Sequence, residues 1–193
     1  MKMNWIESLL IIAGISLDIF AAMECQGSLV AKIDKKHLSL ICALIALWQM
    51  VALFVGNSLA MLLCRDEITQ KESLIGEILA VVIFFGLGIR LLIKALRNER
   101  VNEHREENLG FKRFTLMAAM TSIYTVLAGI AFGLLGTNVT IILVLIVCFT
   151  IAFVIMGMYT GYHLGFEHKT KAYVGGAILL WIAGIDVIIR HLH

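Results

Sequence analysis

Long apolar runs separated by short polar segments dominate this chain. Six such runs can be drawn, at residues 5–28, 38–63, 74–96, 112–136, 138–165 and 172–192. Each reaches the roughly 20 residues that a helix needs to cross the hydrocarbon core of a bilayer. A transmembrane strand would be about half as long and would alternate in polarity, and these runs do not alternate. The pattern predicts an all-α integral membrane protein with six transmembrane helices.

The composition strengthens this prediction. Hydrophobic residues make up 60% of the 193 positions and charged residues only 16%, whereas soluble domains have about 25% charged residues. The first apolar run is too long for a secretory signal, and no convincing cleavage site precedes Gln26. The net charge of +2 lies in the loops and gives no reason to expect nucleic acid. The expected partners are therefore the lipid bilayer and a small substrate.

The distribution of Lys and Arg predicts the orientation. Eleven of these residues, Lys94 among them, lie in or beside the first, third and fifth loops, and four lie on the other side. Because positive charge concentrates on the cytoplasmic side of a membrane protein, we expect the odd loops inside and both termini outside.

A similar sequence segment occurs twice in the chain, once in each half. Residues 15–22 read ISLDIFAA, and residues 121–128 read TSIYTVLA. Gly56 aligns with Gly161 and Gly88 with Gly184 at similar offsets. Three spans per half is an odd number, so the second half would enter the membrane from the opposite side, as in the inverted repeats of many secondary transporters. We expect a first repeat at 1–96, a cytoplasmic linker at 97–111 and a second repeat at 112–193.

Asp18 is the most unusual polar residue, because it lies near the middle of the first apolar run. A carboxylate there costs about 2.5–3.5 kcal/mol on insertion scales, which makes it a candidate functional group. Tyr124 and Gln49 lie at similar depths in the fourth and second runs, and matching positions of inverted repeats meet at the midplane. Such an oxygen-rich cluster would suit a hard divalent cation, with Asp18, Gln49 and Tyr124 as ligands. The residues expected along the substrate pathway are Ser16, Thr121, Ser122 and Asp186. The alternative is a protonated Asp18 that only holds helices together.

Other polar residues rank lower. Arg90 and Asp186 are equivalent in the two halves, but their depths differ by roughly 13 Å at 1.5 Å per residue, so a direct pair would be strained. We expect Arg90 to extend toward the cytoplasm. Asp186 remains a second candidate, on an outward-facing path. Glu24 and Asn57 lie toward helix ends, where we expect them at the membrane interface.

The residues that carry these features resemble a known family. SLDIFAA at 16–22, the Thr121-Ser122 start of the second half, and Gly88-Ile89-Arg90 are similar to the MntP-type bacterial manganese efflux pumps. The resemblance covers essentially the whole chain and implies an exporter of Mn²⁺ in the bacterial cytoplasmic (inner) membrane, with Asp18 as a ligand. The family carries acids where this chain has Tyr124 and Gln49, and a proline where it has Leu53.

The leading hypothesis is alternating-access export of a divalent cation, Mn²⁺ in particular. We expect no resident cofactor, since the metal would be the transported substrate, and no enzyme activity, since no nucleophile-base set is visible. The loss of two family acids keeps two alternatives open: a non-transporting membrane scaffold or assembly relative, and an exporter of another small solute. A homo-oligomer also stays open.

Overall fold

The fold was obtained as a computed structural model, which describes residues 5–30, 35–63, 70–97, 111–165 and 168–192. Within these ranges the chain forms six α-helices and no strand. Their bounds are α1 Trp5–Leu29, α2 Lys35–Leu63, α3 Gln70–Arg97, α4 Phe111–Leu134, α5 Val139–Leu164 and α6 Lys169–Leu192. All six are long and apolar enough to cross a membrane. The predicted fold class is confirmed. Most of the predicted linker, residues 98–110, lies outside the described part of the chain.

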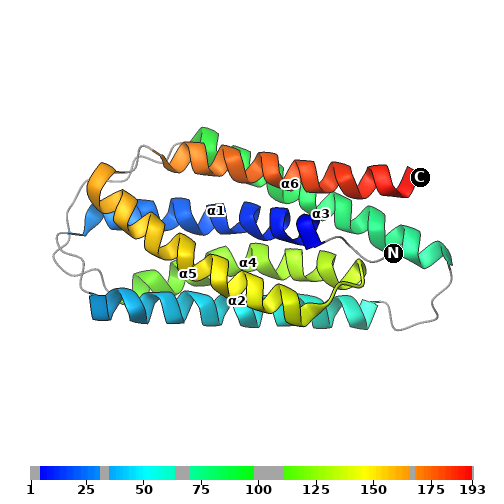
Figure 1. The fold of residues 1–193 in the computed structure, drawn as a ribbon, viewed down its shortest axis with the longest axis horizontal. Helices are drawn as coiled ribbons and strands as arrows, with labels where there is room; N and C mark the ends of the chain where they lie inside the picture. The colour runs from blue at the N-terminus through cyan, green and yellow to red at the C-terminus, as the bar shows by residue number, and fades with distance from the viewer. Residues whose placement is uncertain (1–4, 31–34, 64–69, 98–110, 166–167, 193) are drawn as a thin grey trace.

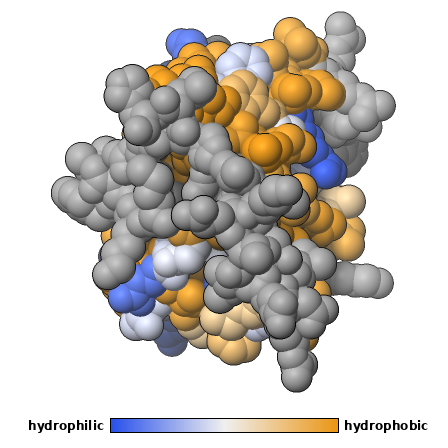
Figure 2. Space-filling view, turned by 90° about the vertical axis from the view of Figure 1, so that its right-hand side faces the viewer, coloured by the Kyte–Doolittle hydropathy of each residue, from blue (hydrophilic) through white to orange (hydrophobic). Residues whose placement is uncertain are grey.

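The helices run roughly along one axis, and α1 begins at the same end of the bundle at which α6 ends (Figure 1). The turn between α4 and α5 lies at this end as well, and Gly136 takes a positive φ of 62° there, which a residue with a Cβ adopts only at a cost. Viewed from this end, the described surface is mostly hydrophobic (Figure 2). Large apolar side chains such as Phe54, Met61 and Leu96 are exposed on the isolated chain, as lipid-facing side chains would be.

The helix pairing follows a simple rule. The extensive contacts join α1 to α5 and α6, α2 to α4 and α5, and α3 to α4 and α6, and a shorter contact joins α1 to α4. This set of pairs is unchanged when α1 is exchanged with α4, α2 with α5, and α3 with α6. An inverted repeat requires this pairing, so the predicted repeat is compatible with the fold. The repeat itself stays a prediction.

Glycines permit a close approach of the helices at two contacts. A Cβ built on Gly161 of α5 would overlap the carbonyl oxygen of Glu24 in α1. A Cβ built on Gly56 of α2 would overlap the carbonyl oxygen of Val126 in α4. Close approach of this kind is the usual role of small residues between membrane helices. The contacts bring the polar groups of α1 and α4 into the interior of the bundle.

Candidate functional site

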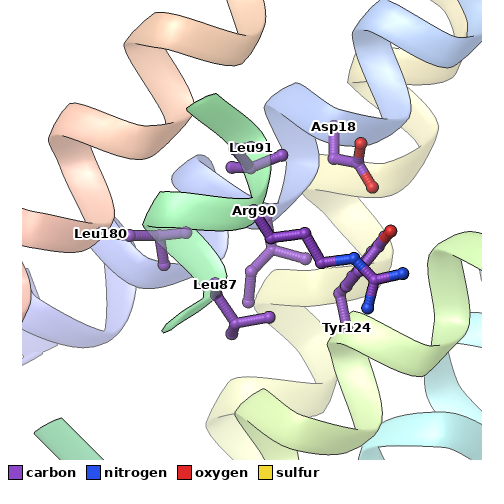
Figure 3. Close-up of a pocket in the computed structure, with 7 residues that line it drawn as sticks. Asp18, Leu87, Arg90, Leu91, Tyr124 and Leu180 are labelled. Carbon is purple, nitrogen blue, oxygen red and sulfur yellow. The ribbon is translucent and has the colours of Figure 1, made fainter. Parts of the chain in front are cut away.

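A small pocket in the bundle interior gathers side chains from four helices. We call it the Asp18 pocket. Its lining residues are Ile15 and Asp18 of α1, Leu87, Arg90 and Leu91 of α3, Tyr124 of α4, and Leu180 of α6. The Asp18 carboxylate, the Arg90 guanidinium and the Tyr124 side chain converge on the same space (Figure 3). The two residues predicted to face each other across the halves, Asp18 and Tyr124, are therefore brought together.

Asp18 is ion-paired inside the bundle. The Lys94 ammonium of α3 donates to Asp18 Oδ1, with an Nζ–Oδ1 distance of 2.7 Å. The Asp18 side chain is 2% exposed, whereas the Lys94 side chain is 33% exposed. The second carboxylate oxygen, Oδ2, is buried and has no hydrogen-bond partner among the described residues. Asp18 thus has one oxygen paired with Lys94 and one oxygen that no side chain or backbone group of the described chain contacts through a hydrogen bond.

Positive charge also collects around the Tyr124 ring. The ring centroid lies 4.6 Å from Arg90 Cζ and 4.5 Å from Lys94 Nζ. Lys94 Nζ lies 5.6 Å from the centroid of Tyr173 in α6 as well. All three distances fall within the roughly 6 Å over which an aromatic face attracts a cation. The surroundings of Asp18 therefore contain one carboxylate, two cationic side chains and two aromatic rings.

The structure changes the expected position of two basic residues. Arg90 was expected to extend toward the cytoplasm and was given no role at the site, but its guanidinium lies over the Tyr124 ring and lines the pocket. Lys94, counted above as a loop-side charge, pairs with Asp18. Both belong to α3 and are four residues apart, so they share one helical face. That i, i+4 spacing was visible in the sequence and could have linked them.

Gln49 lies in a separate polar group, which we call the Gln49 cluster: Gln49, Thr121 and Thr125. The fully buried Gln49 accepts a hydrogen bond at Oε1 from the Thr125 hydroxyl, and its Nε2 donates to Thr121 Oγ1 at 3.5 Å. Thr121 is thus brought together with Gln49 as expected. The cluster joins α2 to α4 but does not line the Asp18 pocket. As a ligand beside Asp18, Gln49 therefore stays a prediction, and its amide oxygen is already engaged.

The remaining predicted residues contribute differently. Ser122 is buried and donates to the carbonyl oxygen of Ala118, one turn back in its own helix, at 2.6 Å. Ser16 precedes Leu17 and Asp18 in α1 and is buried, and its hydroxyl has no hydrogen-bond partner within the described chain. Asp186 is half-buried on α6 and does not line the pocket.

Glu24 and Asn57 are more buried than their expected interfacial position suggested. Glu24 is 0% and Asn57 6% exposed, so both side chains are enclosed by protein; their depth at the membrane interface stays a prediction. Glu24 Oε1 accepts a hydrogen bond from the backbone N–H of His168 at 2.9 Å, just before α6 begins. A carboxylate at this position satisfies one of the unpaired donors of a helix start and complements its dipole. Glu24 therefore fastens the end of α1 to the start of α6.

No preformed metal cage is present in the described residues, since no three His, Cys, Asp or Glu side chains there lie close enough together to hold a metal ion. A cation at Asp18 would therefore depend on one carboxylate and on neutral oxygens.

The fold and the pocket define the class of protein: a multi-pass membrane protein with a buried charged pocket between helices of both halves. Residues 32–188 match the family described as "Putative manganese efflux pump" (Mntp), and the chain belongs to this family. The predicted family resemblance is confirmed.

Three relatives, each named "Putative manganese efflux pump MntP", show how the similarity is distributed. The protein of Acetivibrio thermocellus is 27% identical over 98% of this chain and 93% of its own length. The proteins of Mannheimia succiniciproducens and Campylobacter jejuni are 26% and 25% identical and cover 92% and 98% of this chain, and the same shares of their own lengths. No solved structure matches this chain.

Proposed function

We propose that this protein exports a divalent cation, Mn²⁺ in particular, by alternating access, with Asp18 as the essential ligand. Membership of a family named for manganese efflux supports the substrate. The observation that carries the proposal is the buried Asp18 carboxylate. It opens into a pocket lined by helices of both halves, and one of its oxygens has no hydrogen-bond partner within the described ranges. A buried acid without a full set of partners is costly in a membrane protein and marks a functional site.

The donor set suits a hard cation. Carboxylate, hydroxyl, carbonyl and water oxygens are the ligands that Mn²⁺ and Mg²⁺ prefer. Asp18 would supply the charge, and the Tyr124 hydroxyl, which points toward Asp18 (Figure 3), would supply a neutral oxygen. Gln49 would join them only if its hydrogen bond from Thr125 opened. Ser16, Thr121, Ser122 and Asp186 would line the path to and from the site.

The orientation belongs to the same proposal. The charge bias of the loops supports cytoplasmic odd loops and both termini outside, in the bacterial inner membrane. Export would then load the pocket from the side on which α1 ends and α6 begins.

A growth assay tests the proposal. Cells that lack their own manganese exporter would be challenged with Mn²⁺, Cd²⁺, Co²⁺ and Zn²⁺, with no added protein, with this protein, or with Asp18→Ala. We expect protection against Mn²⁺ from the parent protein and none from Asp18→Ala at equal membrane abundance. Equal protection by both proteins would show that Asp18 is not the ligand. Protection against another metal alone would replace the proposed substrate.

A second candidate is a non-transporting membrane scaffold or assembly protein. The ion pair between Lys94 and Asp18 favours this candidate. A carboxylate that keeps its counter-ion permanently needs no role beyond holding α1 and α3 together. This candidate predicts no protection against any metal and no metal-dependent stabilisation of the purified protein.

A further inference from the structure

We infer that Lys94 is a tethered competitor of the transported cation: its ammonium occupies Asp18 in the empty protein and must leave before a cation can bind. This inference rests on the proposed function, since it concerns how the same pocket is loaded. It assigns to Lys94 the control of the affinity of the pocket for the transported cation and of the release of that cation.

The first support is the position of the ammonium. Lys94 Nζ lies 2.7 Å from Asp18 Oδ1, at the place where a cation bound to that oxygen would lie. A cation that uses both carboxylate oxygens must therefore displace it. Because Asp18 is then free for only part of the time, the apparent affinity for the cation falls in proportion to that fraction.

The second support is an alternative position for the displaced ammonium, over two aromatic rings. The faces of Tyr124 and Tyr173 lie 4.5 and 5.6 Å from Nζ, and a third of the Lys94 side chain is exposed. An ammonium can therefore leave Asp18 and remain over aromatic faces, which attract cations. Little movement of the helix backbone is needed, because the four-carbon stem of lysine is flexible.

The third support is the contrast with Arg90. Its guanidinium lies over Tyr124 but makes no ion pair with Asp18 in the structure. Arg90 thus adds positive charge to the pocket without occupying the carboxylate. Removing the charge of Arg90 changes the electrostatic potential in the pocket. Removing the charge of Lys94 changes it as well and also frees the Asp18 carboxylate.

An exporter benefits from such a competitor. A transported ion must bind well enough to enter and weakly enough to leave. An ammonium on the same helix bundle returns to Asp18 after each release and limits rebinding.

Direct Mn²⁺ binding tests the inference. Free Mn²⁺ would be titrated by electron paramagnetic resonance against the purified full-length protein in detergent, as the parent, Lys94→Met, Lys94→Arg and the neutral pair Asp18→Asn/Lys94→Met. We expect Lys94→Met to bind Mn²⁺ about tenfold more tightly than the parent, as for a site occupied by its competitor nine-tenths of the time. Lys94→Arg should bind like the parent, and the neutral pair should not bind.

Lys94→Gln repeats the test if Lys94→Met fails to fold, because its amide can donate a hydrogen bond to Asp18 without a charge. Mn²⁺ flux in vesicles adds a second readout: the neutral Lys94 variants should turn over more slowly than the parent despite tighter binding. A purely structural Lys94 would instead give weaker binding in every neutral variant.

The outcomes separate the two claims. If the parent binds Mn²⁺ and the neutral Lys94 variants bind no more tightly, Lys94 is no competitor and the proposed function stands. If neither the parent nor any Lys94 variant binds Mn²⁺, the proposed function fails, and the inference fails with it.

Discussion

The Gln49 cluster and the Asp18 pocket both bury polar atoms against α4, yet they differ in how their atoms are paired. In the Gln49 cluster the amide oxygen accepts from Thr125 and the amide nitrogen donates to Thr121. In the Asp18 pocket one carboxylate oxygen is paired with Lys94 and the other has no partner among the described residues. A fully paired neutral group is sufficient to hold two helices together. A half-paired charge is poorly suited to that purpose, and this difference supports the proposal that the Asp18 pocket binds the substrate.

The largest expected effect comes from removing the charge of Asp18. We expect Asp18→Asn to abolish Mn²⁺ flux into everted vesicles, because the amide supplies no negative charge for the cation. Asp186→Asn is the matched control, since it makes the same change in an acid that does not line the pocket. We expect it to reduce flux only in part. Equal losses in the two variants would place the essential charge along the whole path and not at the pocket.

The two close helix contacts that support the clusters should be about equally sensitive to a larger side chain. Gly161→Val would press on Glu24 of α1, and Gly56→Val would press on Val126 of α4. Overpacking of this kind costs about 1–3 kcal/mol, or more where backbone must move. Unfolding of the purified protein in detergent measures it. Gly86→Ala is the control, because a Cβ at Gly86 meets nothing within 4 Å. An unchanged stability for Gly56→Val alone would show that the α2–α4 contact is looser than the α1–α5 contact.

A smaller effect is expected when the neutral cluster is broken. Gln49→Leu removes the hydrogen bonds between α2 and α4, and bonds of this kind in membrane proteins contribute about 0.6 kcal/mol each, at most about 1.7. We expect a stability loss of about 1 kcal/mol with Mn²⁺ protection retained. A double-mutant cycle with Thr125→Val measures the coupling. If Gln49→Leu abolishes protection while the protein remains folded, Gln49 is a ligand, as its depth in the sequence first indicated.

The smallest effect is expected from Tyr124→Phe. The ring that faces Arg90 and Lys94 remains, and only the hydroxyl is lost. We expect a few-fold weaker Mn²⁺ binding at most, measured by the same resonance titration. Tyr124→Leu removes the ring too and should perturb the two basic side chains more strongly. A complete loss of binding in Tyr124→Phe would make the hydroxyl a principal ligand.

The fold and the central acid could be predicted because each follows from a local signal. Run length and composition define the six spans, and Asp18 stands out because its neighbours are apolar. Depth along a straight helix also placed Tyr124 opposite Asp18, since both lie near the centres of their own helices. These predictions need no knowledge of how neighbouring helices are displaced along each other.

The partner of Asp18 could not be predicted in the same way. Lys94 lies three residues before the end of α3, where the sequence favours a loop-side role. Its pairing depends on how far α3 is displaced relative to α1 and on the reach of a lysine stem, and neither is encoded locally. The direction of the Gln49 side chain was missed for a similar reason. Thr121 and Thr125 are one turn apart on α4 and together satisfy the amide, so that depth alone does not bring Gln49 to the pocket.

The helix pairing has a mechanical consequence. Among the extensive contacts, α1 packs on α5 and α6, and α4 packs on α2 and α3, while the α3–α6 and α2–α5 contacts join these two sets of helices. The bond from His168 to Glu24 stays within the first set, and the Gln49 hydrogen bonds and the stacking of Arg90 on Tyr124 stay within the second. The Lys94–Asp18 bond runs from α3 in one set to α1 in the other and adds an ionic link to the α3–α6 and α2–α5 contacts between them. Whatever displaces Lys94 also removes this link, so that filling the pocket loosens the hold of α3 on α1 and favours any arrangement of the helices in which these two residues are apart.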